Sequence, residues 1–477
     1  DVTANLPEFP DWATVKMIEP SPHAAGTAYV VIDAHLLDDF KPRLYKTEDY
    51  GQSWQSLSDE MDQEVYLHVC RADPKVKGLL FAGSDRGVLM SRNDGKTWES
   101  LQLRLPTVPV HDLAVKDNDL VVGTNGRSLW ILDNLTPLRQ LSAQDIEDGA
   151  AKLLDPAPVV RWNYGIGVGG QPNQSTFANP PMGAVIDYWL KKPAKKLTLE
   201  IRDRKGQLVV CFEGKAEEKD GAAEGDKDDD SGNEAERRQV PMSAGLHRLV
   251  WDLTGEGAKP IPNAQVDMGT PAVGIRVNPG EYEVRLTIDE RRFKSKLSIK
   301  PDPRRPVPAG ELAEQEKFAM QIRGDLNELS LTVERLRVVR QQLESRHTLL
   351  KDEAAAAELR EASTALIKKL DELEGKLHNP KAKIPYDILA QKGGAKLYSK
   401  LIFVYNVVLD GEGAPSQGAR EVYGFLKKDL QEQLAAWKNL TGTDLPKLNE
   451  LAKEQNWPIV VLPKLDREMK DKDKRRD

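Results

Sequence analysis

An internal repeat constrains the fold of this chain more than any other feature of its sequence. Residues 22–33 align with residues 74–85 at an offset of 52, and proline, glycine, an aromatic residue and aspartate occupy matching places. Residues 47–54 align with residues 91–98 at an offset of 44, and a third copy from Leu120 follows the second at an offset of 40. Self-similarity at this period is typical of repeat folds such as propellers.

The change of offset places an insertion in the first copy. Eight extra residues are required there, and we assign them to 35–42. Each copy holds four short β-type runs separated by turn residues, for example 65–70, 79–83, 88–91 and 98–101 in the second copy. Four antiparallel strands in roughly 40 to 50 residues are the pattern of a propeller blade. Residues 1–142 are therefore predicted to form three β-propeller blades.

Two octets at blade spacing share a turn signature. They are Thr47, Asp49, Gly51 and Trp54 in the first copy, and Ser91, Asn93, Gly95 and Trp98 in the second. In such a turn the aspartate or asparagine accepts backbone N–H bonds, and the glycine supplies a positive φ. The tryptophan then packs between blades. We interpret these residues as structural, joining the third strand of a blade to the fourth.

The octets resemble the Asp box of BNR-repeat propellers, found in sialidases and sortilin-type receptors. The run from Trp12 to Ser142, with YKTEDYGQSW and DNDLVVGTNGRSLWILDN, is similar to the last blades of large bacterial BNR-repeat proteins often labelled glycosyl hydrolases. The later segments resemble the tail of those proteins, so the resemblance covers nearly the whole chain. It implies architecture more than activity, because the label rests on the Asp boxes. It also implies a secreted or periplasmic location.

Three further regions follow the repeats. Residues 143–182 are rich in Gly, Pro and Asn and are predicted to be a linker or strap. Residues 183–302 are predicted to form an immunoglobulin- or fibronectin-like β-sandwich. Its seven expected strands are 184–190, 197–202, 208–212, 246–253, 274–277, 281–288 and 293–299. Residues 308–458 have apolar residues at helical spacing, which predicts an α-helical bundle, and 459–477 form a charged tail.

The net charge of −7 comes from one inserted loop of the sandwich. Residues 215–236 hold three lysines and ten acidic residues, so the rest of the chain has 65 of each sign out of totals of 68 and 75. This balance excludes a generally basic nucleic-acid binder. Asp226, Asp228 and Asp230 alternate as in calcium loops, but Ser231 and Arg237 stand where an EF-type loop needs Gly and Glu. No metal site is predicted.

The cysteines and the missing motifs exclude other classes. Cys70 and Cys211 lie in apolar runs of different predicted domains, which favours buried thiols over a disulfide. The longest apolar stretch, 401–409, is about half of a membrane span, so no transmembrane segment is predicted. The chain has no GxSxG, HExxH, phosphate-loop or CxxC motif, and no cofactor is predicted.

Candidate ligand residues come from the turns opposite the boxes. Successive turns of an up-and-down blade alternate between its two faces, so the insertion and the matching turns share the face that carries ligands in the resembled propellers. The candidates are Asp33, His35, Asp38, Asp39, Asp85, Arg86, His111 and Arg127. A solvated rim of turn residues is the alternative interpretation. A divalent metal on Asp33, His35 and Asp38 or Asp39 lacks a diagnostic spacing.

Three blades cannot close a propeller, since known propellers have about four or more. The unpaired first and last blades would expose apolar faces. We therefore expect an N-terminal propeller portion or another chain to complete the ring. The chain begins with Asp1 rather than Met, which fits a processed chain or a fragment of a longer one.

Two functions from different classes stay open. The first is an extracytoplasmic binding and scaffold protein whose propeller recognises a glycan or a peptide. The alternative is an exo-acting, sialidase-like glycoside hydrolase with its catalytic residues mainly outside this chain. Glycosidases need two carboxylates, or in sialidases a Tyr nucleophile with an acidic partner and an arginine cluster. Only Arg86 and Arg127 fall on the expected face, so no catalytic residue is assigned.

Overall fold

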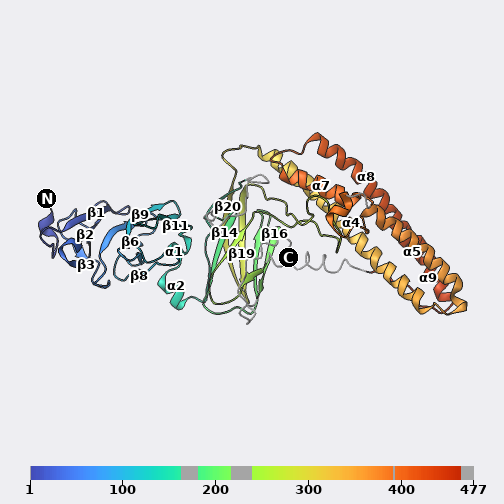
Figure 1. Cartoon of the computed structure of the whole chain (residues 1–477), viewed down its shortest axis with the longest axis horizontal. Coiled ribbons are helices and arrows are strands. Elements are labelled where there is room, and N and C mark those ends of the chain that lie inside the picture. The colour runs from blue at the N-terminus through green and yellow to red at the C-terminus, as the bar shows by residue number, and fades with distance from the viewer. Residues whose placement is uncertain (1, 163–180, 216–238, 390–392, 464–477) are drawn as a thin grey trace.

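A computed structural model of the chain describes residues 2–162, 181–215, 239–389 and 393–463. Three parts follow one another along the long axis of the molecule: a stack of small sheets, a larger β region and a helical bundle (Figure 1). Among the described residues, none of the helices combines the length and apolar character that a membrane span requires. The predicted acidic loop, apart from Lys215, and residues 464–477 of the charged tail lie outside the described ranges.

The repeats form three antiparallel sheets whose strands pair in sequence order. The first contains β1 (Thr14–Pro20), β2 (Ala28–Ala34), β3 (Asp39–Thr47) and β4 (Gln55–Ser56), with short 3-10 turns η1 (Thr3–Asn5) and η2 (His35–Leu37). The second contains β5 (Leu67–Ala72), β6 (Leu80–Ser84), β7 (Val88–Ser91) and β8 (Glu99–Ser100). The third contains β9 (Val110–Lys116), β10 (Asp119–Thr124) and β11 (Leu129–Leu132).

The third sheet differs from the expected blade, because the described residues add no fourth strand to it. The third copy has no turn octet like those at 47–54 and 91–98 to turn the chain back. Instead, the chain enters helices α1 (Thr136–Gln140), with Pro137 in its first turn, and α2 (Ala143–Asp148). Proline fits the first turn of a helix, where its missing N–H costs nothing, but it cannot donate to a sheet ladder.

The three sheets stack face to face as blades of a partial propeller. In β6, Leu80 and Ala82 join a core shared with the first blade, while Phe81 joins a core shared with the third. This alternation follows from the two-residue period of a strand. The first strands β1, β5 and β9 contact one another in turn, so they line the axis of the stack.

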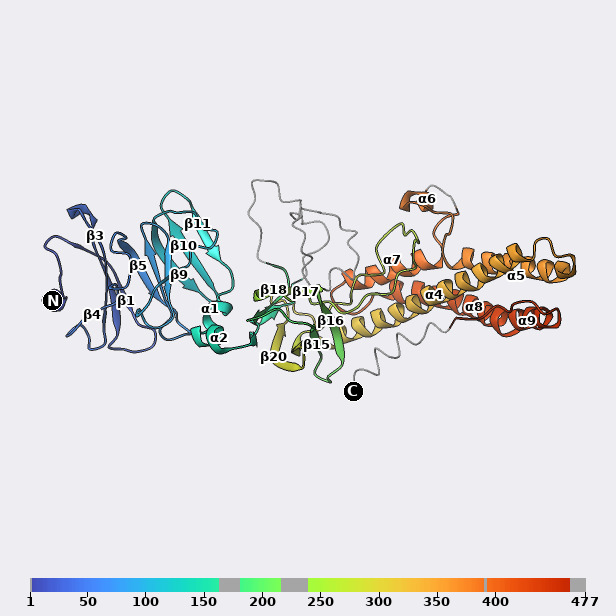
Figure 2. The same cartoon turned by 90° about the horizontal axis from the view of Figure 1, so that it is seen from below.

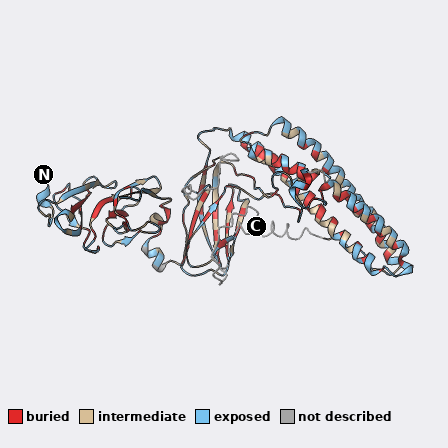
Figure 3. Cartoon of the chain, in the orientation of Figure 1, coloured by how far each residue is buried: buried red, intermediate tan, exposed pale blue. Residues whose placement is uncertain are grey.

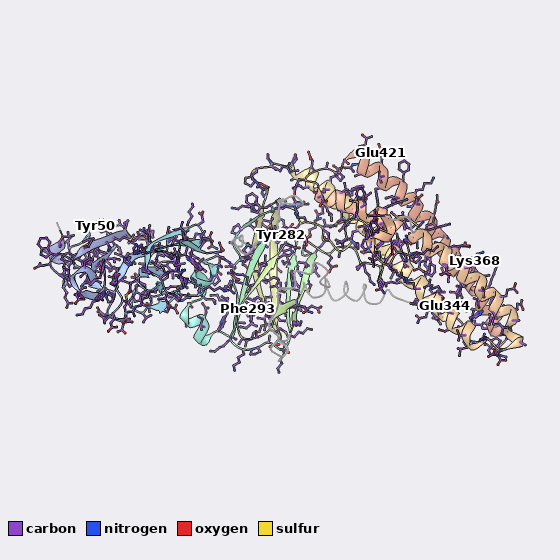
Figure 4. All side chains as sticks on the ribbon, viewed as in Figure 1. Tyr50, Tyr282, Phe293, Glu344, Lys368 and Glu421 are labelled. Carbon is purple, nitrogen blue, oxygen red and sulfur yellow. The ribbon has the colours of Figure 1, made fainter. Side chains whose placement is uncertain are left out.

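Both predicted turn octets fold in the same way. The Thr47 and Ser91 hydroxyls accept the backbone N–H groups of Gly51 and Gly95 at 2.9 and 2.8 Å. Asp49 Oδ1 accepts the Ser53 N–H, and Asn93 Oδ1 accepts the Thr97 N–H, each at 2.9 Å. Both glycines have φ near +85°, which a side chain would disfavour. The exposed Tyr50 marks the first octet, at the end of the molecule that the first blade occupies (Figure 4).

Two sheets with one common core form the β region. The smaller has the order β12 (Ala151–Leu153), β14 (Ala184–Leu190), β18 (Gly245–Trp251). The larger has the order β13 (Val159–Val160), β20 (Arg291–Lys300), β19 (Gly280–Ile288), β15 (Leu197–Arg202), β16 (Leu208–Lys215), β17 (Gln239–Pro241). Six of the seven expected runs are strands, whereas 274–277 contributes only an isolated bridge from Arg276 to Thr254. Residues 143–182, predicted as a linker, supply β12 and β13.

The last part is helical, as the apolar spacing predicts. Its elements are α4 (Ala309–Leu349), η3 (Ala354–Ala356), α5 (Ala357–Leu377), α6 (Pro385–Leu389), α7 (Leu397–Asp410), α8 (Gln417–Asn439), the π-helical turn η4 (Leu440–Asp444) and α9 (Leu445–Glu454). The long helices bury one continuous core between them (Figure 3). Ala258, Ile261 and Ile275, from the loop between β18 and β19, join that core and attach the β region to the bundle.

Candidate functional site

A β-bulge occurs at the same place in the first strand of every blade. The pairing register skips one residue between Val15 and Met17 in β1, between Leu67 and Val69 in β5, and between Val110 and Asp112 in β9. The skipped residues are Lys16, His68 and His111. A bulge aims one side chain away from the ladder and is common beside functional sites. Since these strands line the axis, the three blades direct one basic residue each to equivalent axial positions.

A row of aromatic rings crosses the blades at these bulges. His35, at the start of the insertion, stacks on Tyr66 with centroids 4.5 Å apart and planes at 14°. Tyr66 meets His68 edge-on at 5.1 Å, and His68 lies 4.3 Å from His111. Phe40 approaches Tyr66 at 6.0 Å from the β2–β3 hairpin, which projects from one side of the stack (Figure 2). The row therefore runs from the first blade to the third.

Two aspartates at equivalent repeat positions flank the row, Asp33 near the end of β2 and Asp85 directly after β6, and their pKa values shift in opposite directions. Asp33 accepts the backbone N–H and the Nδ1–H of His35 at 2.9 and 2.7 Å, and Lys16 Nζ lies 3.3 Å away. Burial raises the pKa of Asp33, but these hydrogen bonds outweigh it and the net pKa is lowered. In Asp85, burial dominates and raises the pKa. Its Oδ1 is buried and has no hydrogen-bond partner among the described residues.

His68 is the most enclosed member of the row. It is 8% exposed, and its Nε2 has no hydrogen-bond partner within the described part of the chain. Burial, together with the smaller effects of the nearby His111 and Lys16, lowers its pKa to about 4. The ring is therefore neutral at pH 7. A buried neutral imidazole with a free nitrogen is ready to accept or donate one hydrogen bond.

The structure brings some of the predicted residues together and separates others. Asp33, His35, Asp85 and His111 meet around Tyr66 and His68. Asp38 ends the η2 turn with φ +61° and is exposed, and Asp39 pairs instead with Arg43. Arg86 reaches only 3.7 Å from Asp62 and Asp85, and the exposed Arg127 uses its carbonyl to hold Trp130. We define the axial cluster as Lys16, Asp33, His35, Tyr66, His68, Asp85 and His111.

Three members of the axial cluster do not appear among the residues predicted from sequence: Lys16, Tyr66 and His68. The repeat offers a signal for two of them, because the offset of 52 that aligns Pro22 with Pro74 also aligns Lys16 with His68. A bulge has no local sequence signature, so the axial direction of the Lys16 and His68 side chains is visible only in the strand register.

The donor set suits hydrogen bonding and stacking. Within the described ranges, no group of three or more His, Cys, Asp or Glu side chains is arranged to hold a metal ion. Stacked rings, a buried acceptor at Asp85 and a neutral imidazole have the chemistry that suits a ligand with flat apolar faces and hydrogen-bond donors.

Comparison with known proteins gives only distant likenesses. No protein-family model and no curated protein matches the chain. Among solved structures, an ancestral GH74 enzyme is 14% identical over 37% of this chain and 28% of its own, with a TM-score of 0.20. YCF48 bound to D1 peptide is 12% identical over 41% of this chain and 52% of its own, with a TM-score of 0.20. The GH74 xyloglucanase from Xanthomonas campestris is 12% identical over 64% of this chain and 40% of its own, with a TM-score of 0.21.

The chain thus spans about half or less of the length of these structures. At these TM-scores we assign the blades from their own strand order and cores, and not from the likeness.

Proposed function

We propose that this chain belongs to an extracytoplasmic binding and scaffold protein whose BNR-type propeller recognises a glycan or a peptide at the axial cluster. The observation that carries the proposal is the repeated bulge, which directs Lys16, His68 and His111 to equivalent positions beside Asp33 and Asp85. Bulges are over-represented next to active sites, where they re-aim a side chain. The two matching box turns support the BNR assignment.

The scaffold part of the proposal rests on the rest of the chain. The bundle and the β region are joined by the loop between β18 and β19, whose Ile261 enters the bundle core, and by two ion pairs. Arg161 and Arg276 pair with Glu412 at 2.5 and 3.1 Å, respectively. Such a joint holds the two regions in one orientation. We propose an immunoglobulin-like sandwich and a helical bundle that mediate assembly beside the propeller, outside the cytoplasm.

Further blades complete the ring in this proposal, from an N-terminal propeller portion or from another chain. Trp98 Nε1 donates to the Leu57 carbonyl of the preceding blade at 2.8 Å. The equivalent Trp54 Nε1 is buried without a partner among the described residues. At the other end, Leu129 and Ile131 of β11 are 72% and 59% exposed. The first blade therefore lacks an acceptor for the Trp54 N–H, and the third blade lacks a neighbour that covers β11.

A histidine titration by NMR tests the binding proposal. Oligosaccharides and peptides would be added to the chain while the imidazole signals of His35, His68 and His111 are followed. We expect shifts in these signals. In His68→Gln/His111→Gln the remaining signal of His35 should no longer shift, whereas all three signals should still shift in the distant control His347→Gln. A panel that leaves the three signals unmoved contradicts the proposal.

One observation favours the alternative, an exo-acting glycoside hydrolase. Asp33 has a lowered pKa and Asp85 a raised one, and carboxyl groups whose pKa values are pushed apart are the mark of an acid and its ionised partner. No arginine cluster stands beside them in the described residues. Hydrolysis of aryl glycosides by the completed assembly, abolished in Asp85→Asn, would establish the hydrolase and displace the binding proposal.

A further inference from the structure

The insertion of the first blade carries a concentrated apolar surface next to the axial cluster. Leu36 is 84% exposed, and Leu37 and Phe40 are 46% and 44% exposed. The three side chains fall within five residues, on the η2 turn and the start of β3, and we call them the apolar lip. The equivalent turns of the other blades are polar, with Asp85 and Arg86 in the second and Asn125 and Arg127 in the third. The lip thus breaks the symmetry of the repeat.

The lip is continuous with the ring row through Tyr66. The ring centroids of Phe40 and Tyr66 lie 6.0 Å apart. His35, which directly precedes the two leucines, stacks on the same Tyr66 ring. Asp85 lies on the other side, where its backbone N–H donates to the Tyr66 carbonyl at 3.2 Å. Tyr66 is therefore the meeting point of an apolar surface, an aromatic platform and a carboxylate.

Two buried polar atoms at this place have no partner among the described residues: Asp85 Oδ1 and His68 Nε2. An unpaired buried acceptor costs free energy that a ligand donor would recover. His68 is 8% exposed, so its ring lies beneath the surface beside Tyr66, whereas the Asp85 side chain is 19% exposed and part of its carboxylate faces solvent. The ligand must supply hydrogen-bond donors here and apolar surface over the lip.

We propose that the axial cluster binds an extended peptide segment, with one large apolar side chain against the lip and backbone N–H groups directed to Asp85. This inference rests on the proposed binding function and specifies its ligand. A peptide alone among the two ligand classes combines N–H donors with an aliphatic or aromatic side chain. A neutral glycan offers hydroxyl donors and CH faces for the rings, but it gives exposed leucines little surface to bury.

The test compares defined probes on the full chain. Saturation-transfer and imidazole NMR titrations would use acetyl-Ala-Ala-Leu-Ala-Ala-amide, the same peptide with a central serine, and cellotetraose. We expect the leucine peptide to bind at least tenfold more tightly than the serine peptide. This preference should vanish in Leu36→Ser/Leu37→Ser/Phe40→Ser. Leu349→Ser, which replaces a 76% exposed leucine at the C-terminal end of α4, serves as the control and should keep the preference.

Several results would overturn this inference without touching the proposed function. They are binding of cellotetraose alone, equal affinity for the two peptides, or an unchanged preference in the triple variant. Sedimentation of the chain with phosphatidylcholine–phosphatidylglycerol vesicles, lost in the triple variant, would assign the lip to a lipid surface and also overturn it. Failure of every probe to move the histidine signals would instead contradict the proposed function itself. Far-UV circular dichroism verifies that each variant is folded.

Discussion

The second and third blades share a strand register and differ in what covers their outward faces. In the second blade, Phe81, Val88 and Met90 point toward the third and are at most 2% exposed. The positions equivalent to Val88 and Met90 in the third blade are Leu129 and Ile131, which face outward and are exposed. An alternating strand thus defines which face needs a neighbour, and the neighbour decides whether that face becomes a core.

The largest expected effect is a difference in stability between these two faces. Phe81→Ala empties a closed inter-blade core and should lower the free energy of unfolding by about 3 to 5 kcal/mol. Ile131→Ala removes a side chain that already faces water, so its cost should be within about 0.5 kcal/mol. Urea unfolding followed by tryptophan fluorescence measures both. A cost of several kcal/mol for Ile131→Ala would mean that its face is covered in solution.

Acid should destabilise the second blade through His68. Its pKa is about 4 in the folded chain and 6.5 when free, so the unfolded state binds the proton first. The stabilisation is fully present above pH 6.5 and is lost as the pH falls through 4, by roughly 2 to 3 kcal/mol. Unfolding free energies measured from pH 7 to 4 give this slope, which His68→Gln should flatten. Parallel curves for the two proteins would contradict the burial of a neutral His68.

Two glycines with positive φ, one in each of the same two blades, should differ less in the stability that alanine substitution costs. Gly95 in the second and Gly126 in the third have φ of +84° and +86°, so alanine costs about 1 kcal/mol at either place. A Cβ at Gly95 would also lie 2.7 Å from Leu57 of the first blade, whereas at Gly126 nothing lies within 4 Å. We expect Gly95→Ala to cost about 2 kcal/mol and Gly126→Ala about 1. Equal melting temperatures would show that Leu57 moves aside freely.

Local patterns of the sequence predicted much of the fold. The repeat and the two octets placed the strands and octet turns of the first two blades, and helical spacing placed α4 and α5. Long-range pairing was not predictable in the same way. Val159 pairs in parallel with Ile299, 140 residues away, so a segment that looked like a linker became a sheet edge. The local sequence of a two-residue strand does not predict which distant strand it pairs with.

The candidate site was predicted only in part, for a related reason. Turn chemistry identified Asp33, His35 and Asp85, because these residues lie at or directly after the ends of strands at repeat positions. Lys16 and His68 sit inside strands, where alternation alone assigns them to a face of the sheet. The bulge redirects them to the axis, and it depends on the pairing of two strands rather than on either one.

The smallest expected difference in stability concerns the tryptophan N–H of the two turn octets. Trp98→Phe removes the N–H that satisfies the Leu57 carbonyl and should cost about 1 kcal/mol, because that acceptor is left without its partner. Trp54→Phe removes an N–H that is buried and unpaired among the described residues, so stability should be unchanged or slightly higher. Thermal unfolding of the two variants measures the difference. In an assembly completed by a preceding blade, Trp54 would gain an acceptor and the two substitutions should cost the same. A loss of stability on Trp54→Phe in the chain alone would mean that its N–H already has an acceptor there.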